Sequence, residues 1–139
     1  MDKTDNGKTK QTGPPENNPL IMVVDDEPNM CAALQRVLEA EGYRVVTALD
    51  GKSALSLIPE VKPDLILLDI MMPGMHGQEV GMRARELGDS RIVYFTARAD
   101  IAGAENLKGQ FAEADAFLAK PATAKRILAV VDATLGHQR

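Results

Sequence analysis

Polar residues that could do chemistry stand directly after four short apolar stretches of the sequence. In chain order they are Asp25-Asp26-Glu27, Asp69, Thr96 and Lys120-Pro121. Carboxylates that are packed together repel one another, and some take up protons unless a cation lies between them. A hard divalent ion with oxygen ligands, such as Mg²⁺, relieves that repulsion. The residue types therefore indicate a divalent-cation site, provided that the fold brings them together.

Each of these residues also has a simpler structural interpretation. The acidic run at Asp25 can cap the helix that follows it, where carboxylates favour the positive end of the helix dipole. A single Asp69 can hold its own loop, and Thr96 can bond to a neighbouring backbone group. Lys120 can be an exposed residue before a proline that starts a helix. A capping role, however, does not require all four sets to follow strands in this order.

The elements that must position these residues alternate along the chain. Continuous apolar runs predict strands buried on both faces at 20–24, 65–68 and 92–95, and weaker runs predict edge strands at 44–48 and 116–119. Helical spacing predicts helices around 31–38, 54–58, 80–87 and 124–135. The segment 99–114 also has helical spacing, which Gly103 and Gly109 weaken. Five strands alternating with five helices predict a doubly wound α/β sheet.

Taken together, these motifs resemble the receiver domain of two-component response regulators. The matching stretches are Val23-Val24-Asp25-Asp26-Glu27, Leu67-Leu68-Asp69-Ile70-Met71-Met72-Pro73-Gly74, Thr96-Ala97 and Phe117-Leu118-Ala119-Lys120-Pro121. The resemblance covers about Leu20 to Leu135. It implies a flavodoxin-like fold, in which a five-stranded parallel sheet of strand order 2-1-3-4-5 has helices on both faces.

The resemblance also implies roles for residues at the strand ends. Asp69 would accept a phosphoryl group as the nucleophile, because a carboxylate can form an aspartyl phosphate. Asp25, Asp26, Asp69 and the backbone carbonyl of Met71 would hold Mg²⁺ or Mn²⁺, with Asp25 acting partly through water. Lys120 would neutralise charge on the transferring oxygens.

Three further expectations concern the switch. The Lys120-Pro121 bond would be cis, which would aim the lysine into the pocket. Thr96 would offer its hydroxyl to a phosphoryl oxygen, and Phe117 would turn inward into the space released. An ordinary core position for Phe117 stays open as the alternative. His76 stands where the family more often has Asp, and we expect it to be a loop or helix-start residue.

Composition limits the class of protein and its surroundings. Sixteen Lys and Arg against 20 Asp and Glu give a net charge of −4, which argues against direct binding of nucleic acid. The single Cys31 fits a reducing cytoplasm, and no apolar run approaches the roughly 20 residues of a membrane span. Residues 1–19 are polar and predict a disordered tail, so we expect the receiver domain to occupy 20–139.

The expected function is a signalling module rather than an enzyme with a turnover substrate. Its phosphodonor would be a sensor histidine kinase or a histidine phosphotransfer protein. An unknown output partner would bind the face made by 99–114, 116–119 and 124–135, the fourth helix, fifth strand and fifth helix. One alternative is a phosphate-independent interaction module. Another is an Asp-nucleophile phosphatase, which would need a second Asp where Met71 stands.

Overall fold

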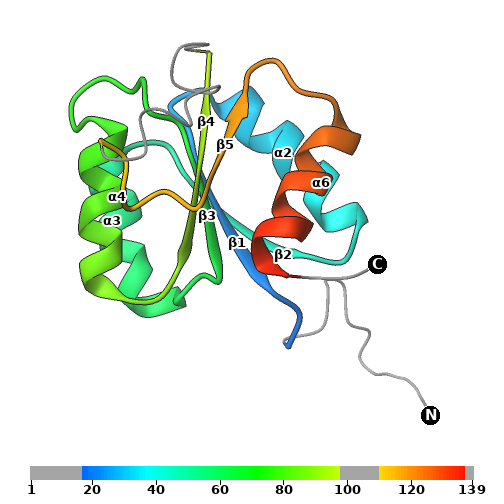
Figure 1. Ribbon diagram of the computed structural model, residues 1–139, viewed down its shortest axis with the longest axis horizontal. Helices are drawn as coiled ribbons and strands as arrows, with labels where there is room; N and C mark the ends of the chain where they lie inside the picture. Colours follow the sequence, from blue (N-terminus) through cyan, green and yellow to red (C-terminus); the bar gives the residue numbers. More distant parts are fainter. Residues whose placement is uncertain (1–16, 98–109, 137–139) are drawn as a thin grey trace.

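The computed structural model describes residues 17–97 and 110–136, which form a parallel sheet between two layers of helices (Figure 1). The strands are β1 (Leu20–Val24), β2 (Arg44–Ala48), β3 (Leu65–Leu68), β4 (Arg91–Thr96) and β5 (Ala116–Ala119). All pairs are parallel and the order is β2-β1-β3-β4-β5. The predicted fold class and strand order are confirmed, and β2 and β5 are the edge strands.

Helices cover both faces of the sheet. In the described part of the chain they are α2 (Pro28–Ala40), α3 (Gly51–Val61), α4 (Gly77–Leu87) and α6 (Ala124–Leu135). Figure 1 shows α3 and α4 on one side and α2 and α6 on the other. Of the helix predicted over 99–114, residues 99–109 lie outside the described residues and 110–113 form a turn.

Alternation along each central strand explains the continuous apolar runs. In β1, Met22 and Val24 belong to the core beneath α3 and α4, whereas Ile21 and Val23 belong to the core beneath α2 and α6. Every residue of β1 and β3 is buried. A strand that is covered on both faces needs apolar residues at every position rather than at every second one.

Helix α4 begins against the backbone that follows β3. A Cβ at Gly77 would lie 2.2 Å from the carbonyl oxygen of Asp69 and 2.5 Å from Cα of Ile70. Glycine is therefore required at this helix start, because the close approach leaves no room for a side chain. His76 is the N-cap, and its Nδ1 accepts a hydrogen bond from the backbone N–H of Gln78 at 3.2 Å. His76 is a helix-start residue, as predicted.

Two residues at the end of the predicted tail, Asn18 and Pro19, make hydrogen bonds to the start of β2 and the turn before it. Asn18 Nδ2 donates to the carbonyl of Gly42 at 2.6 Å, and Arg44 donates from Nε to the carbonyl of Asn18 at 2.8 Å. The carbonyl of Pro19 accepts from the backbone N–H of Arg44. Asn18 and Pro19 therefore pack against the fold, while residues 1–16 of the predicted tail lie outside the described residues. Among the described residues, no helix is long and apolar enough to cross a membrane.

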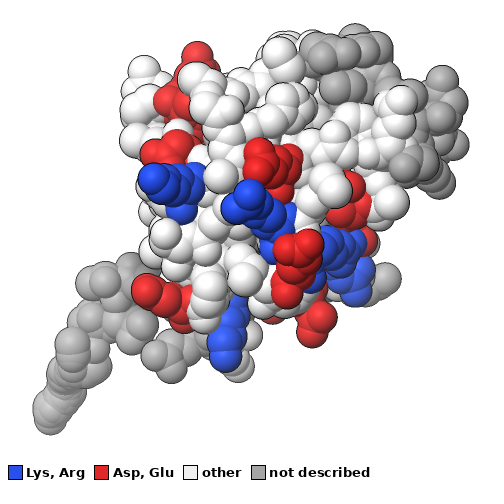
Figure 2. Space-filling view, turned by 90° about the vertical axis from the view of Figure 1, so that its left-hand side faces the viewer, with Lys and Arg blue, Asp and Glu red and all other residues white. Residues whose placement is uncertain are grey.

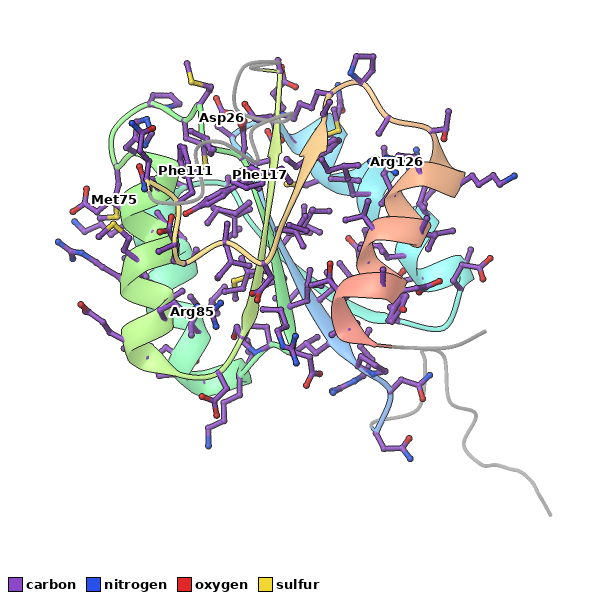
Figure 3. All side chains as sticks on the ribbon, in the orientation of Figure 1. Asp26, Met75, Arg85, Phe111, Phe117 and Arg126 are labelled. Atoms are coloured by element: carbon purple, nitrogen blue, oxygen red, sulfur yellow. The ribbon has the colours of Figure 1, made fainter. Side chains whose placement is uncertain are left out.

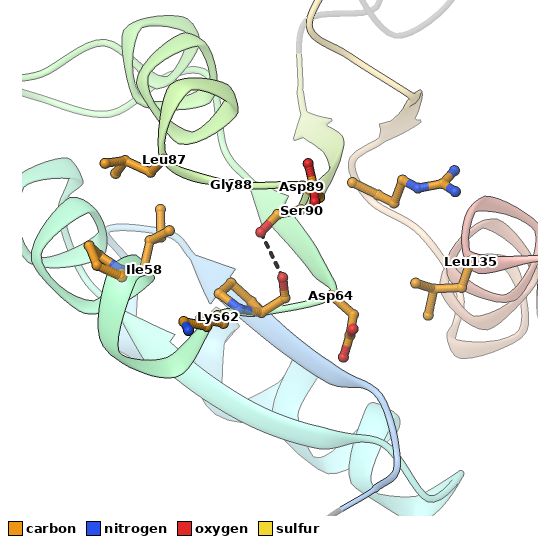
Figure 4. A pocket seen from close by; sticks show the side chains of 11 residues that line it. Ile58, Lys62, Asp64, Leu87, Gly88, Asp89, Ser90 and Leu135 are labelled. Carbon is orange, nitrogen blue, oxygen red and sulfur yellow. Dashed lines mark hydrogen bonds between the residues drawn. The ribbon is translucent and has the colours of Figure 1, made fainter.

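A cavity of about 620 Å³ opens at the edge of the sheet where β3 and β4 begin (Figure 4). Ser90 is buried there, and its hydroxyl donates to the carbonyl of Pro63 at 2.6 Å. Asp64 Oδ2 accepts the backbone N–H of Leu20 at 2.7 Å, and Arg91 reaches the carbonyl of Thr134. These lining groups are used in holding neighbouring segments together, and the cavity lies away from the predicted site residues.

The face shown in Figure 2 carries charges of both signs, interleaved. On α4, Arg83 pairs with Glu79 at 2.9 Å, and Arg85 pairs with Asp115 at 2.9 Å. Interleaved charges produce no large field of one sign. This face therefore does not resemble a basic surface built for phosphate backbones.

Candidate functional site

The carboxyl ends of the strands bring the predicted site residues to one edge of the sheet. The backbone N–H of Asp25 donates to the carbonyl of Ala48 at 3.2 Å, and that of Asp69 donates to Val24 at 3.0 Å. The backbone N–H of Lys120 likewise donates to the carbonyl of Thr96 at 2.8 Å. These bonds continue the sheet ladder by one residue, so the backbone of each functional residue is fixed by its neighbouring strand.

Three carboxylates form a cluster at this edge. Oxygen atoms of Asp25, Asp26 and Asp69 all lie within 4.8 Å of one another. Asp25 and Asp69 are 1% and 5% exposed, whereas Asp26 is exposed to solvent and is labelled in Figure 3 near the tops of the strands. All ligand atoms in the cluster are carboxylate oxygens, which is the donor set that Mg²⁺ and Mn²⁺ prefer.

The ammonium group of Lys120 bridges the two buried aspartates. Its Nζ lies 2.8 Å from Oδ2 of Asp25 and 3.3 Å from Oδ2 of Asp69. Among residues 17–97 and 110–136, one cation therefore faces the three carboxylates, and this part of the cluster carries an excess of negative charge. That excess favours a further cation at the cluster.

Burial governs the ionisation of the paired groups. Burial raises the pKa of the Asp69 carboxyl above its ordinary value, although the N–H of Met71 and the Lys120 ammonium act in the opposite direction. Burial alone would lower the pKa of Lys120, but the hydrogen bond and charge of Asp25 and the charge of Asp69 outweigh it, and the pKa is raised. Lys120 therefore remains a cation at neutral pH, available to a negatively charged group.

Asp25 and Asp69 each use one oxygen to hold their own loop. Oδ1 of Asp25 accepts the N–H of Glu27 at 3.0 Å, and Oδ1 of Asp69 accepts the N–H of Met71 at 3.0 Å. The other oxygen of each faces Lys120. Glu27 is the N-cap residue of α2 and makes no side-chain capping bond. Each of the two aspartates therefore holds its loop with one oxygen and faces the pocket with the other. Side-chain capping of α2 does not explain the acidic run.

Met71 and Pro121 flank the cluster. The Met71 side chain is 51% exposed, while its backbone N–H holds Asp69. The Lys120-Pro121 peptide bond is cis. Met71 therefore contacts the cluster through its backbone, and Pro121 directly follows the lysine that bridges Asp25 and Asp69.

Thr96 and Phe117 lie on neighbouring strands. Thr96 is fully buried at the last position of β4, where it pairs with Ala119. Phe117 pairs with Tyr94 and is half-buried, with its ring centroid 5.9 Å from that of Tyr94 and 5.6 Å from that of Phe111. Figure 3 shows Phe111 and Phe117 on the α4 side of β5. Phe117 is thus part of an aromatic cluster two residues below Thr96.

Two contacts of the site have no counterpart in the sequence motifs. The Nζ atom of Lys120 lies 5.3 Å from the ring centroid of Phe95, and Sγ of Cys31 donates to the carbonyl of Asp25 at 3.4 Å. Phe95 and Cys31 belong to the core beneath α2 and α6. The apolar spacing around Phe95 and Cys31 predicts that both lie in the core. It does not predict that they contact Lys120 and Asp25.

Comparison with known proteins identifies the family. Residues 21–132 match the sequence model of the response regulator receiver domain, and the chain belongs to this family. It is 38% identical over 115 residues to the DNA-binding response regulator MtrA of Mycolicibacterium smegmatis. The matched region covers 83% of this chain and 50% of MtrA. It is 40% identical over 116 residues to the response regulator MprA of Mycolicibacterium vanbaalenii, and this match covers 83% of this chain and 49% of MprA.

A solved structure agrees with this assignment. The CheY-like response regulator receiver domain protein of Methanospirillum hungatei superposes with a TM-score of 0.78 at 27% identity, over 86% of this chain and 95% of that one. The chain spans about half the length of the curated relatives it matches.

Membership of the family fixes the broad function. The chain is a receiver domain of two-component signalling, a class that is phosphorylated by histidine kinases and regulates output partners. Receiver domains bind Mg²⁺ at an acidic pocket and are not enzymes with a turnover substrate.

Proposed function

We propose that Asp69 is the phosphoryl acceptor of this receiver domain. The observation that carries the proposal is the placement of its Oδ2 atom 3.3 Å from the Lys120 ammonium, within a cluster of three carboxylates. Asp69 is buried and its backbone is held by Val24, so the nucleophilic oxygen has a fixed position. A fixed nucleophile beside a fixed cation is what phosphoryl transfer requires.

Asp25, Asp26, Asp69 and the backbone carbonyl of Met71 would hold Mg²⁺ or Mn²⁺. The donor set fits, because it consists of oxygen atoms and carries more negative charge than Lys120 neutralises. When bound, the ion neutralises negative charge on the phosphoryl oxygens.

The chain's own groups account for the remaining chemistry. An oxygen of Asp69 attacks the phosphorus of a phosphohistidine, the P–O bond forms and the P–N bond breaks. The electron pair of the broken bond stays on the imidazole of the donor. Lys120 stabilises the charge that develops on the phosphoryl oxygens, and hydrolysis later returns the Asp69 carboxylate and inorganic phosphate.

Thr96 and Phe117 would convert this local event into a surface change. The Thr96 hydroxyl would bind a phosphoryl oxygen, and Phe117 would move into the space that Thr96 leaves. The strand register supports this coupling, because Phe117 pairs with Tyr94 on the neighbouring strand, two residues before Thr96. The output partner would bind the face that includes β5 and α6, and the donor would be a histidine kinase or a histidine phosphotransfer protein.

A phosphatase function has little support. Such an enzyme needs an acid or base two positions after its nucleophile, and this position is Met71, whose side chain is 51% exposed. A thioether cannot donate or accept the required proton.

The test is phosphorylation by acetyl phosphate in the presence of Mg²⁺, followed by the intact mass. Wild type should gain the mass of one phosphoryl group, and chelation of Mg²⁺ should abolish the gain. Asp69→Asn should gain none, because an amide is not a nucleophile at this site. Asp89→Asn, at an exposed position on the opposite edge of the sheet, is the matched control and should react like wild type. A wild-type mass gain in Asp69→Asn would overturn the assignment.

A further inference from the structure

The ring of Phe95 lies beside the site, where it contacts the ammonium group of Lys120. Phe95 is the fifth residue of β4, 2% exposed, and the Lys120 Nζ atom lies over its ring at 5.3 Å from the centroid. A cation within about 6 Å of an aromatic face is attracted by the negative face of the ring. This contact is separate from the aromatic cluster of Tyr94, Phe111 and Phe117.

The hydrogen-bonding capacity of Lys120 leaves room for such a contact. An ammonium group carries three N–H donors. Within the described part of the chain, Lys120 Nζ donates to Asp25 at 2.8 Å and to Asp69 at 3.3 Å. The ring of Phe95 provides a third neighbour that attracts the cation and accepts no conventional hydrogen bond.

A divalent ion would compete with Lys120 for its two carboxylate contacts but not for its contact with the ring of Phe95. Oxygen atoms of Asp25 and Asp69 are the ones expected to bind a divalent ion, and Asp69 is also the expected phosphoryl acceptor. An ion at those oxygens competes with Lys120 for the same lone pairs. No divalent ion with oxygen ligands competes for an apolar ring. Phe95 is therefore the contact that can hold the ammonium in place at each stage.

The ring itself is held rigidly. Phe95 pairs with Leu118 across β4 and β5 and packs in the core beneath α2 and α6. Lys120 follows two residues after Leu118, and its backbone N–H is bonded to the carbonyl of Thr96, the residue after Phe95. The ring and the lysine backbone are thus fixed to the same pair of strands.

We propose that Phe95 is a positioning residue that holds the Lys120 ammonium over the phosphoryl site through its aromatic face. The proposal rests on the proposed function of Asp69 and Lys120. It states that the electron-rich face of the ring, and not only its volume, supports phosphoryl transfer.

The contact is tested first without any phosphorylation. The ε protons of Lys120, assigned by NMR in the metal-free protein, should be shifted upfield by the ring current of Phe95. Phe95→Leu, which keeps an apolar residue in the core, should remove that shift. Phe111→Leu is the control and should leave it unchanged. Lys120 ε protons without a ring-current shift in wild type would overturn the proposal, whatever the phosphorylation assay gives.

The energetic role is tested with fluorinated phenylalanines placed at position 95 alone. Successive fluorination weakens the negative face of the ring while nearly preserving its shape. The initial rate of phosphorylation by acetyl phosphate with Mg²⁺ should fall stepwise, to roughly threefold to tenfold below wild type for the trifluorinated ring.

The matched control is the same series at Phe111, which should leave the rate unchanged. The unfolding free energy should depend on fluorination at 95 less in a Lys120→Met background than in wild type, because the cation is gone. Equal rates along the position 95 series in a protein that is phosphorylated normally would overturn the positioning role. Absence of phosphorylation in wild type would instead contradict the proposed function, and the NMR shift would still decide the contact.

Discussion

The aspartates of the cluster differ in how many carboxylate oxygens are already hydrogen-bonded and so in how readily they can bind a metal ion. Asp25 uses Oδ1 for the N–H of Glu27 and Oδ2 for Lys120, and it is almost fully buried. Asp26 is exposed, and its carboxylate has no hydrogen bond or ion pair within the described residues. A metal ion can therefore take up Asp26 without breaking an existing contact, whereas Asp25 must first give one up.

Removing Asp26 should therefore weaken Mg²⁺ binding more than removing Asp25. We expect Asp26→Asn to raise the dissociation constant for Mg²⁺ roughly tenfold or more, because an amide oxygen replaces a charged ligand. Titration of the metal-free protein followed by NMR or calorimetry measures this. Asp89→Asn serves as the control and should bind like wild type. Unchanged affinity in Asp26→Asn would remove this residue from the metal site.

The residues brought together at the site could be predicted from sequence because they follow strands. Carboxyl ends of parallel strands meet at one edge, so Asp25, Asp69 and Lys120 had to converge once the strands were recognised. Phe95 and Cys31 could not be predicted in this way. Their contacts depend on how far a lysine chain and a helix reach over the core, which spacing along the sequence does not encode.

At the scale of elements, the segment before β5 is tied to α4 by side chains that no motif contains. Arg85 of α4 donates to the carbonyl of Glu113 from Nε at 3.2 Å and from Nη2 at 2.9 Å, and pairs with Asp115 at 2.9 Å. Oδ2 of Asp115 also accepts the N–H of Ile92 at 2.8 Å, and the Tyr94 hydroxyl donates to Glu113. Arg85 is labelled on α4 in Figure 3.

Removing this tie should destabilise the fold modestly. We expect Arg85→Ala to lower the free energy of unfolding by about 1–2 kcal/mol, since charge-assisted bonds to the carbonyl are lost while the ion pair is partly exposed. Urea unfolding followed by circular dichroism measures the change. The control is Arg83→Ala, whose partner Glu79 lies on the same exposed helix face, and it should cost less than about 0.5 kcal/mol. Equal costs for the two variants would show that Arg85 does not anchor the segment.

The elements of the central fold were predictable, whereas the region between β4 and β5 was not. Strands covered on both faces and helices with regular apolar spacing leave strong patterns, and all of the described ones were predicted. The turn at 110–113 is held by Arg85 and by Gln78, which donates to the carbonyl of Gln110 at 2.5 Å. Polar contacts of this kind between distant elements leave no periodicity in the sequence.

Thr96 should couple the phosphoryl site to this same segment. We expect Thr96→Ala to be phosphorylated but to lose most of the structural response, because its hydroxyl is the proposed differential contact. Amide exchange or NMR shifts of Phe111 to Phe117, with and without beryllofluoride as the phosphoryl mimic, measure the response. Thr123→Ala, which removes the N-cap of α6, is the control for losing a threonine hydroxyl elsewhere. A full response in Thr96→Ala would place the coupling elsewhere.

At the scale of the whole molecule, the packing of the fold compensates for the unfavourable free energy of holding buried carboxylates close together at the site. Two cores, one on each face of the sheet, hold the strand ends rigidly enough to keep three carboxylates together. Burial of Asp69 raises its pKa, so the native state without metal disfavours the ionised form of this carboxyl. The free energy of unfolding of the metal-free protein should therefore depend on pH.

The sign of that dependence follows from the raised pKa. A carboxyl whose pKa in the folded protein exceeds its ordinary 3.8 contributes stability at low pH, and this contribution is lost as pH rises through the folded pKa. Relative to Asp69→Asn, wild type with chelator present should therefore become less stable as pH rises above 3.8. Urea unfolding of both proteins at a series of pH values measures the difference, in which the other titrating groups largely cancel.

Adding Mg²⁺ at neutral pH should stabilise wild type more than Asp69→Asn. A ligand that binds only the native state stabilises it by an amount that increases with its affinity, and wild type keeps the full set of three carboxylates for the ion. We therefore expect the midpoint of unfolding to rise more in wild type than in Asp69→Asn. Wild type that gains stability relative to Asp69→Asn with rising pH in the presence of chelator would contradict the raised pKa. An equal effect of Mg²⁺ on the two proteins would show that Asp69 is not among the groups that hold the ion.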